Sequence, residues 1–198
     1  MVITRRGCLR LFGQGAIVLG GFGLLSLVPD GGNPHIVRPP GAVDEVYFRV
    51  LCVRCGICLE VCPTGTIVLT GFENGPAAAN TPKIEPIISP CEFYRGRCEQ
   101  RMQCALHCPT GALRQVEKER VKLGTVSFVQ NHCLAYQGQE CVVCSEMCPV
   151  AGAITVTEDL KPSFDLQKCV GCGSCVYSCP AIPKALTLIS DGATRVKW

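Results

Sequence analysis

Charged and aromatic residues are scarce in this chain of 198 residues. Asp, Glu, Lys and Arg together make up 18% of it, the aromatic residues 6%, and the formal net charge is only +3. No basic stretch is interleaved with aromatic residues, so nucleic acid is not an expected partner. Hydrophobic residues, cysteine included, account for 47%, which is too apolar a composition for a disordered chain.

The motifs of common catalytic sites are missing as well. No glycine-rich loop joins a strand to a helix, because Gly13 and Gly15 lie in the N-terminal apolar segment, and no Ser/His/Asp set stands out. We therefore expect no catalytic residues and no substrate chemistry by the chain itself.

The N-terminus, residues 1–33, has the pattern of a targeting segment. Arg5 and Arg6 precede an apolar, glycine-containing stretch over residues 11–28, which resembles a twin-arginine export signal. A cleaved peptide, a retained membrane anchor and a buried core helix are all compatible with this stretch. Because no clear A-x-A cleavage site follows and about 18 apolar residues can span a bilayer, we favour an uncleaved N-terminal helix in the membrane.

Cysteine is the residue in excess, with 17 in the chain. Apart from Cys8, they form four groups of four, and every group ends in the pattern Cys-x3-Cys-Pro. The first and fourth groups share the spacing C-x2-C-x2-C-x3-C, whereas the second and third are wider. In chain order the groups are Cys52, Cys55, Cys58 and Cys62; Cys91, Cys98, Cys104 and Cys108; Cys133, Cys141, Cys144 and Cys148; and Cys169, Cys172, Cys175 and Cys179. The chain is therefore organised by an internal repeat.

The flanks of the groups repeat too. A short apolar or β-branched run follows each group, and another precedes the first, third and fourth. The runs are residues 67–69, 113–116, 154–156 and 186–189 after the groups, and 46–51, 126–129 and 163–166 before them. Each unit is predicted to be a strand, a cysteine loop, a short helix through the last two cysteines and a second strand, which gives an α+β fold.

The spacing points to iron–sulfur clusters. In the bacterial ferredoxin pattern, three closely spaced cysteines bind one 4Fe–4S cluster and the fourth binds its neighbour. Gly56, Gly171 and Gly173 leave room for the backbone to approach a cluster. Structural zinc would more usually show two C-x2-C pairs, and a disulfide framework belongs to smaller secreted chains. The wide second group also leaves open an altered or missing cluster at that position.

Two stretches resemble a known family. Residues 38–45, Arg-Pro-Pro-Gly-Ala-Val-Asp-Glu, lead into Cys52-Val-Arg-Cys55-Gly-Ile-Cys58, and residues 133–144 contain the seven-residue gap of the third group. Both resemble the ferredoxin-type subunits of the NapG/MauM group. The resemblance covers nearly the whole chain, but the second group is less compact than is usual there.

The resemblance implies four 4Fe–4S clusters, with the first group paired with the fourth and the second with the third. The sixteen cysteines would then be cofactor-binding iron ligands in four sets: Cys52, Cys55, Cys58 and Cys179; Cys169, Cys172, Cys175 and Cys62; Cys91, Cys98, Cys104 and Cys148; and Cys133, Cys141, Cys144 and Cys108. The matching spacing of the first and fourth groups supports the outer pairing. This predicts nested tandem modules within residues 34–198: an outer two-cluster module (42–75 plus 160–198) and an inserted one (84–158).

The family also implies a function. Its members are exported proteins that relay single electrons from a membrane quinol-oxidising or polyferredoxin-type subunit to a periplasmic redox enzyme or cytochrome. We accordingly expect a location on the periplasmic side of the bacterial inner membrane. The alternative is an iron–sulfur subunit fixed in a molybdenum or tungsten oxidoreductase or a hydrogenase complex; the twin-arginine segment favours the relay.

Overall fold

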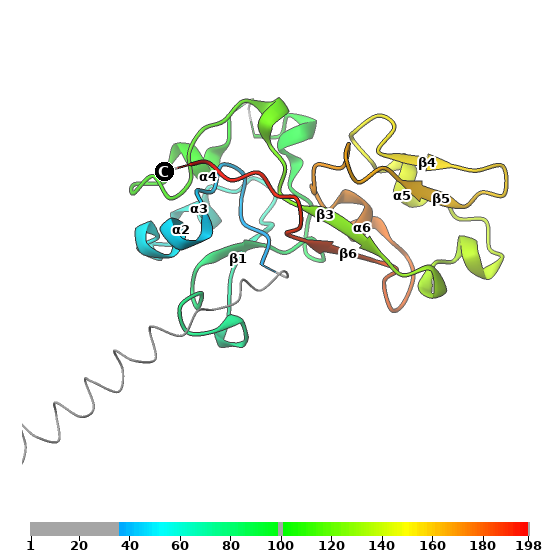
Figure 1. The fold of residues 1–198 in the computed structure, drawn as a ribbon, viewed down its shortest axis with the longest axis horizontal. Coiled ribbons are helices and arrows are strands. Elements are labelled where there is room, and N and C mark those ends of the chain that lie inside the picture. Colours follow the sequence, from blue (N-terminus) through cyan, green and yellow to red (C-terminus); the bar gives the residue numbers. More distant parts are fainter. Residues whose placement is uncertain (1–35, 99–100, 198) are drawn as a thin grey trace, which may run out of the picture. The chain divides into compact units, whose positions relative to one another are not determined.

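The computed structural model describes residues 36–98 and 101–197 (Figure 1). The chain divides into a unit of Met1–Gly32 and a unit of Asn33–Trp198, and the second contains everything described below. The predicted export signal, N-terminal helix and membrane segment at 11–28 lie outside the described residues. Within the described part, no helix combines the length and apolarity needed to cross a membrane.

The elements of the described unit are short, as the cysteine repeat predicts. The helices are α2 (Glu45–Leu51), α3 (Ile57–Glu60), α4 (Gln103–Leu106), α5 (Val143–Glu146) and α6 (Ser174–Ser178). The strands are β1 (Ile67–Leu69), β2 (Pro82–Ile84), β3 (Thr125–Phe128), β4 (Ile154–Val156), β5 (Pro162–Phe164) and β6 (Leu186–Ile189). Single 3₁₀ turns, such as Glu92–Arg95, join several of them. The structure confirms small ferredoxin-type units of mixed helix and strand.

Three antiparallel pairs of strands set the topology. β1 pairs with β2, β4 with β5, and β3 with β6, the last in the register Thr125 opposite Ile189. The β3–β6 pair joins the strand before the third cysteine group to the strand after the fourth, with β4 and β5 between them in sequence. In the first half of the unit, an antiparallel bridge between Ala42 and Leu113 encloses β1 and β2 in the same way.

This pairing corrects the predicted nesting. The first two cysteine groups lie in one module, residues 42–113, and the last two in a second, residues 125–189. The modules follow each other along the chain, and the proposed outer module of residues 42–75 plus 160–198 does not form. The strand that follows the first group pairs with the strand that precedes the second, and β4 after the third group pairs with β5 before the fourth, so these strand pairs combine the groups in chain order. In Figure 1, α2, α3, α4 and β1 gather on one side, with β3–β6, α5 and α6 on the other.

Residues 46–51 form a helix, α2, and the strand predicted there is wrong. The apolar run over residues 46–51 predicts a strand, but Phe48 alone of its three alternate positions is buried, whereas Val46 and Val50 are 74% and 79% exposed. The i,i+4 ion pair of Glu45 with Arg49, at 3.0 Å, suits the helix instead. Residues 113–116 contribute one bridge and no strand, and β2 was not predicted.

Arg38 connects the start of the unit to the N-terminal module from inside. Its side chain is fully buried and donates to both carboxylate oxygens of Glu45, at 2.6 and 2.9 Å, and to the Thr81 hydroxyl at 2.7 Å. Its guanidinium also lies 4.6 Å from the centre of the Phe48 ring. Burial of a guanidinium is tolerated here because its charge is paired and its donors are used.

The two modules are held together by the close packing of Gly173 against Pro86 and by a bridge that Val196 forms. A Cβ on Gly173, whose φ is +81°, would stand 2.6 Å from Cβ of Pro86 in the other module. Val196, beyond β6, forms a parallel bridge with Val43 and donates its N–H to Ala42 O at 3.0 Å. The chain thus returns to the N-terminal module after completing the C-terminal one.

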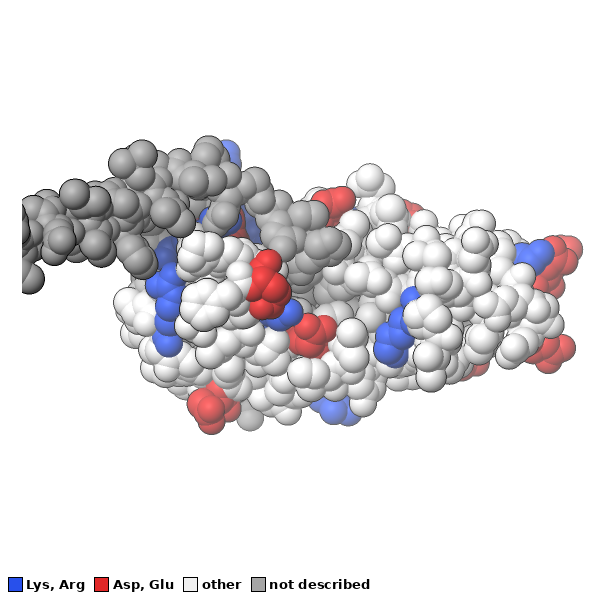
Figure 2. Space-filling view, turned by 90° about the horizontal axis from the view of Figure 1, so that it is seen from below, with Lys and Arg blue, Asp and Glu red and all other residues white. Residues whose placement is uncertain are grey.

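Surface charge is dispersed on the face shown in Figure 2. Among the described residues drawn there, basic and acidic side chains are scattered and separated by uncharged surface. Contact with a partner on this face therefore cannot depend on one large area of single sign.

We expect Arg38→Met to lower the stability of the protein by about 3 kcal/mol, because it removes the fully buried partner of the Glu45 carboxylate and the donor to the Thr81 hydroxyl and the Pro82 carbonyl. The measurement is the midpoint of thermal denaturation by circular dichroism, on protein kept without oxygen. Arg49→Met is the matched control: it removes the other arginine on Glu45, which is more exposed, and should cost only about 0.5 kcal/mol. Equal effects of the two variants would contradict the role given to Arg38.

Candidate iron–sulfur sites

Four hollows in the unit are each lined by four cysteines. Every hollow takes the first three cysteines of one group and the last cysteine of the group beside it. Site 1 is lined by Cys52, Cys55, Cys58 and Cys108; site 2 by Cys62, Cys91, Cys98 and Cys104; site 3 by Cys133, Cys141, Cys144 and Cys179; and site 4 by Cys148, Cys169, Cys172 and Cys175. All sixteen cysteines singled out in the sequence line one of these sites.

The assignment of the fourth cysteines differs from the prediction. The structure brings Cys108 to the first group, where Cys179 was expected, and Cys62 to the second group, where Cys148 was expected. Likewise Cys179 lies with the third group and Cys148 with the fourth. The exchange occurs within each module, because the two groups of a module are those whose strands pair.

The short helices explain how one group serves two hollows. In each group the third cysteine lies on the helix (Cys58 on α3, Cys104 on α4, Cys144 on α5, Cys175 on α6), and the fourth follows after the helix ends. A proline comes next and cannot continue the helix. In each module the two helices contact each other, α3 with α4 and α5 with α6. The fourth cysteine of one group therefore lies at the hollow of the other.

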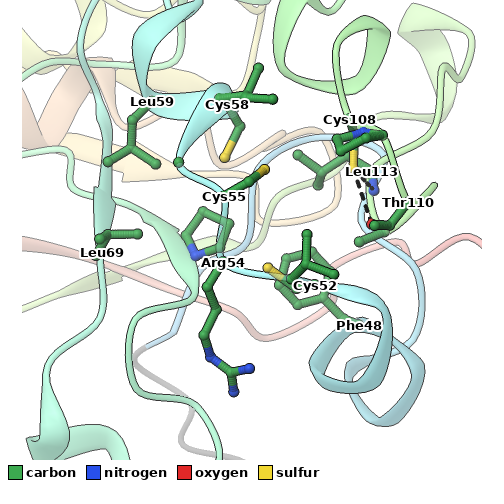
Figure 3. Close-up of a pocket in the computed structure, with 16 residues that line it drawn as sticks. Phe48, Cys52, Arg54, Cys55, Cys58, Leu59, Leu69, Cys108, Thr110 and Leu113 are labelled. Carbon is green, nitrogen blue, oxygen red and sulfur yellow. Dashed lines mark hydrogen bonds between the residues drawn. The ribbon is translucent and has the colours of Figure 1, made fainter.

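Site 1 shows the arrangement in detail (Figure 3). The empty space in the hollow and at its open mouth is about 410 Å³, and the remaining lining is largely apolar, with Phe48, Leu59 and Leu113 among the side chains. Cys108 faces the other three cysteines from the opposite segment of chain. The corresponding space at the other hollows is about 330 to 430 Å³.

In this fold, and without a metal, most of the thiols are harder to deprotonate than a free cysteine. Burial, reinforced by neighbouring thiols, raises the pKa of Cys58 to about 12 and of Cys144 to about 11. Burial also raises the pKa of Cys91 to about 12, and the pKa of Cys175 further still. Since a thiolate is the form that binds iron, a metal must displace these protons, and metal binding then contributes to folding.

The pKa of Cys108 is shifted in the opposite direction. Burial raises its pKa, but hydrogen bonds from the backbone N–H groups of Leu113 and Thr110 and from the Thr110 hydroxyl together lower it below the ordinary value. The Leu113 N–H donates to the Cys108 sulfur at 3.5 Å, and the Thr110 oxygen lies 3.7 Å from that sulfur. The sequence analysis missed Thr110 and its counterpart Thr64; the repeated motif Cys-Pro-Thr-Gly at 62–65 and 108–111 was the available signal.

Contacts between the sites define an order. The thiol of Cys58 in site 1 is among the neighbours that raise the pKa of Cys104 in site 2, after burial and the nearer thiols. In the C-terminal module, Cys144 of site 3 acts in the same way on Cys175 of site 4. Between modules, the Cys91 N–H of site 2 donates to the Cys172 carbonyl of site 4 at 2.8 Å. Together with the contacts of α3 with α4 and of α5 with α6, these neighbours place the sites in the order 1, 2, 4, 3.

Exposed groups lie at both ends of this order. Cys55 of site 1 is the exposed cysteine among the sixteen, and the others are buried or half-buried. Val53 beside it is 61% exposed, and the outward face of α2 adds Val46 and Val50. At the other end, Ile182 near Cys179 of site 3 is 97% exposed.

The donor sets fit 4Fe–4S clusters. A cluster of this type takes four cysteine thiolates, three from one loop and one from elsewhere in the two-cluster pattern, which is the composition of every site. All sixteen cysteines are free thiols, so none is used in a disulfide. Among the described residues, no three His, Cys, Asp or Glu side chains stand close enough to hold a single metal ion.

Comparison with known families agrees with the geometry. Residues 51–112 match the family described as "4Fe-4S dicluster domain", and residues 160–181 match "4Fe-4S binding domain". The dicluster match spans the first and second cysteine groups, which are the two that the structure combines in the N-terminal module.

Curated relatives extend over most of the chain. It is 34% identical to the methylamine utilization ferredoxin-type protein MauM of Paracoccus denitrificans, over 91% of this chain and 87% of the relative. It is 33% identical to MauM of Methylophilus methylotrophus, over 82% and 78% respectively. It is 36% identical to the ferredoxin-type protein NapG of Escherichia coli, over 72% and 65%. With its cysteine sites, this likeness establishes that the chain belongs to the MauM/NapG family of ferredoxin-type proteins and serves in iron–sulfur electron transfer.

Proposed function

We propose that the chain binds four 4Fe–4S clusters, one at each of sites 1 to 4, and conducts single electrons along the order 1, 2, 4, 3. The observation that carries this proposal is the reciprocal exchange of fourth cysteines, which gives every hollow four sulfur ligands. A bound cluster supplies a one-electron couple. The chain's own part is to hold the clusters in sequence, keep water from them and adjust their potentials through hydrogen bonds and exposure.

The contact between modules supports the order of transfer. Cys91 and Cys172 are ligands of different sites, and a main-chain hydrogen bond of 2.8 Å joins them directly. The packing of Gly173 against Pro86 and the bridge between Val43 and Val196 are two further contacts that hold these segments together. Sites 2 and 4 therefore stay at a fixed separation, as a transfer step between them requires.

The chain receives electrons, on this proposal, from a membrane quinol-oxidising or polyferredoxin-type subunit and passes them to a periplasmic redox enzyme or cytochrome. It would be exported by the twin-arginine route and attached to the periplasmic side of the inner membrane through residues 11–28. The pattern of residues 1–33 supports the export, and the relationship to MauM and NapG supports the redox role.

The exposed end at site 1 suits exchange with a partner. Exposed Cys55 lies beside Val53 and near the outward side of α2, so a partner that covers these apolar side chains would come close to the site. A redox partner can displace water from apolar side chains without having to pair any charge, so an apolar surface suits this contact.

The pairing of cysteines can be tested by combining substitutions. Cys55→Ala and Cys108→Ala should each abolish the same 4Fe–4S cluster, so the double variant should retain about three clusters, as each single variant does. Cys55→Ala with Cys179→Ala should retain only about two, since these cysteines belong to sites 1 and 3. Intact clusters are counted by spin integration of the EPR spectrum of fully reduced protein.

The nested arrangement makes the opposite prediction for the two double variants. If Cys55→Ala with Cys179→Ala kept as many clusters as either single variant, the sites described above would be wrong.

The full complement can be tested by chemical analysis of protein purified without oxygen. Four clusters require about 16 iron and about 16 acid-labile sulfide per chain. About 12 of each would mean that one site holds no intact cluster. Site 2, which takes three cysteines from the widely spaced second group, would be examined first. Zinc in place of iron would overturn the proposed function.

A further inference from the structure

The N-terminal module contains the same four residues twice. Cys62-Pro-Thr-Gly and Cys108-Pro-Thr-Gly both follow a short helix, and both place a threonine two residues after the cysteine that crosses to the neighbouring site. The hydroxyl oxygens of Thr64 and Thr110 lie at similar distances from the cysteine sulfurs, 3.6 and 3.7 Å. From the sequence the two threonines are equivalent.

The structure separates them by what else each hydroxyl contacts. The Thr64 hydroxyl donates to the carbonyl oxygen of Pro90 at 3.1 Å. A hydroxyl has one proton, and a carbonyl can only accept, so the proton of Thr64 is directed to Pro90. Toward the Cys62 sulfur, Thr64 then presents an oxygen lone pair.

Thr110 is arranged differently. Among the described residues, the Cys108 sulfur is the hydrogen-bond partner of its hydroxyl, and the Leu113 N–H approaches the same sulfur at 3.5 Å. A cysteine that ligates iron has lost its proton and can only accept, so Thr110 must be the donor in the loaded protein. Figure 3 shows both contacts converging on Cys108 as dashed lines.

We propose that Thr110 is a potential-setting residue: its hydroxyl raises the reduction potential of site 1, whereas Thr64 has no such effect on site 2. Reduction of a cluster held at site 1 would add one electron, supplied by the redox partner at that end of the chain or by site 2, with no bond broken or formed. The added negative charge strengthens a hydrogen bond to a ligand sulfur, so Thr110 stabilises the reduced form more than the oxidised one. Site 1, beside exposed Cys55, is therefore easier to reduce than it would be without the Thr110 hydroxyl.

The C-terminal module has no corresponding pair of threonines. In the C-terminal module, the residues that correspond to the threonines are Val150 and Ala181, which have no hydroxyl, whereas Ser174 lies 3.4 Å from the sulfur of Cys172. The two modules thus differ in several groups at once. Sites 1 and 2 share the motif and differ in the direction of the threonine proton.

The test is a potentiometric titration of the loaded protein followed by EPR. Thr110→Val keeps the shape of the side chain and removes the donor; it should shift the reduction equilibrium of site 1 about tenfold toward the oxidised form, or about 59 mV for a one-electron couple. Thr110→Ser, which keeps a hydroxyl, should restore most of the shift. Thr64→Val is the matched control and should leave the reduction potential of site 2 unchanged.

The inference rests on the proposed function, and the experiment distinguishes the two. Cys55→Ala and Cys98→Ala identify which of the titration waves belong to sites 1 and 2, and iron and sulfide contents show that the threonine variants remain loaded. If the site 1 wave is present and Thr110→Val leaves it unmoved, or if Thr64→Val moves site 2 equally, the role of Thr110 is wrong. If the unaltered protein gives no site 1 wave, the proposed function itself fails, and the inference with it.

Discussion

The fourth cysteine of each group is the constraint on which the rest of the structure depends. It follows the end of a helix of one turn, with a proline behind it, and so lies across from the hollow that its own group surrounds. No group can complete a site alone. Two groups must face each other with their helices in contact, as α3 does with α4 and α5 with α6, and every site then takes three cysteines from one group and one from the other.

Little else in the unit is able to fix these loops. The strands have three or four residues each and pair only two at a time, and most helices have four or five residues. Such elements bury little surface by themselves. Two devices compensate: the buried Arg38, which joins α2 to β2, and the return of Val196 to Val43. Burial raises the pKa of many of these thiols, and they stabilise the protein only when a metal replaces their protons. Cofactor and fold are therefore expected to depend on each other.

The sequence allowed the sixteen cysteines, most of the strands and the mixed fold to be predicted, because these follow from local spacing and alternation. It did not allow the pairing of groups to be predicted. The first and fourth groups have the same spacing, but spacing describes only how one loop surrounds a site; the choice of partner follows from which strands meet. Residues 46–51 illustrate the same limit: their apolar run suits a strand, and the contacts of Phe48 and Glu45 with Arg38 favour a helix. Direction of a hydroxyl proton, as at Thr64 and Thr110, is likewise a property of the fold alone.

Tandem modules have a consequence for conduction that nested ones would not. In a nested arrangement, the first and fourth groups share a module, and both ends of the chain of cysteines are brought together. In the observed order, sites 1 and 3 are the ends and belong to different modules, while sites 2 and 4 meet through the backbone of Cys91 and Cys172. Apolar side chains are exposed at both ends, Val53 near site 1 and Ile182 near site 3. A molecule built in this way can contact a donor at one module and an acceptor at the other at the same time, so it suits a fixed connection between two proteins as well as a mobile carrier.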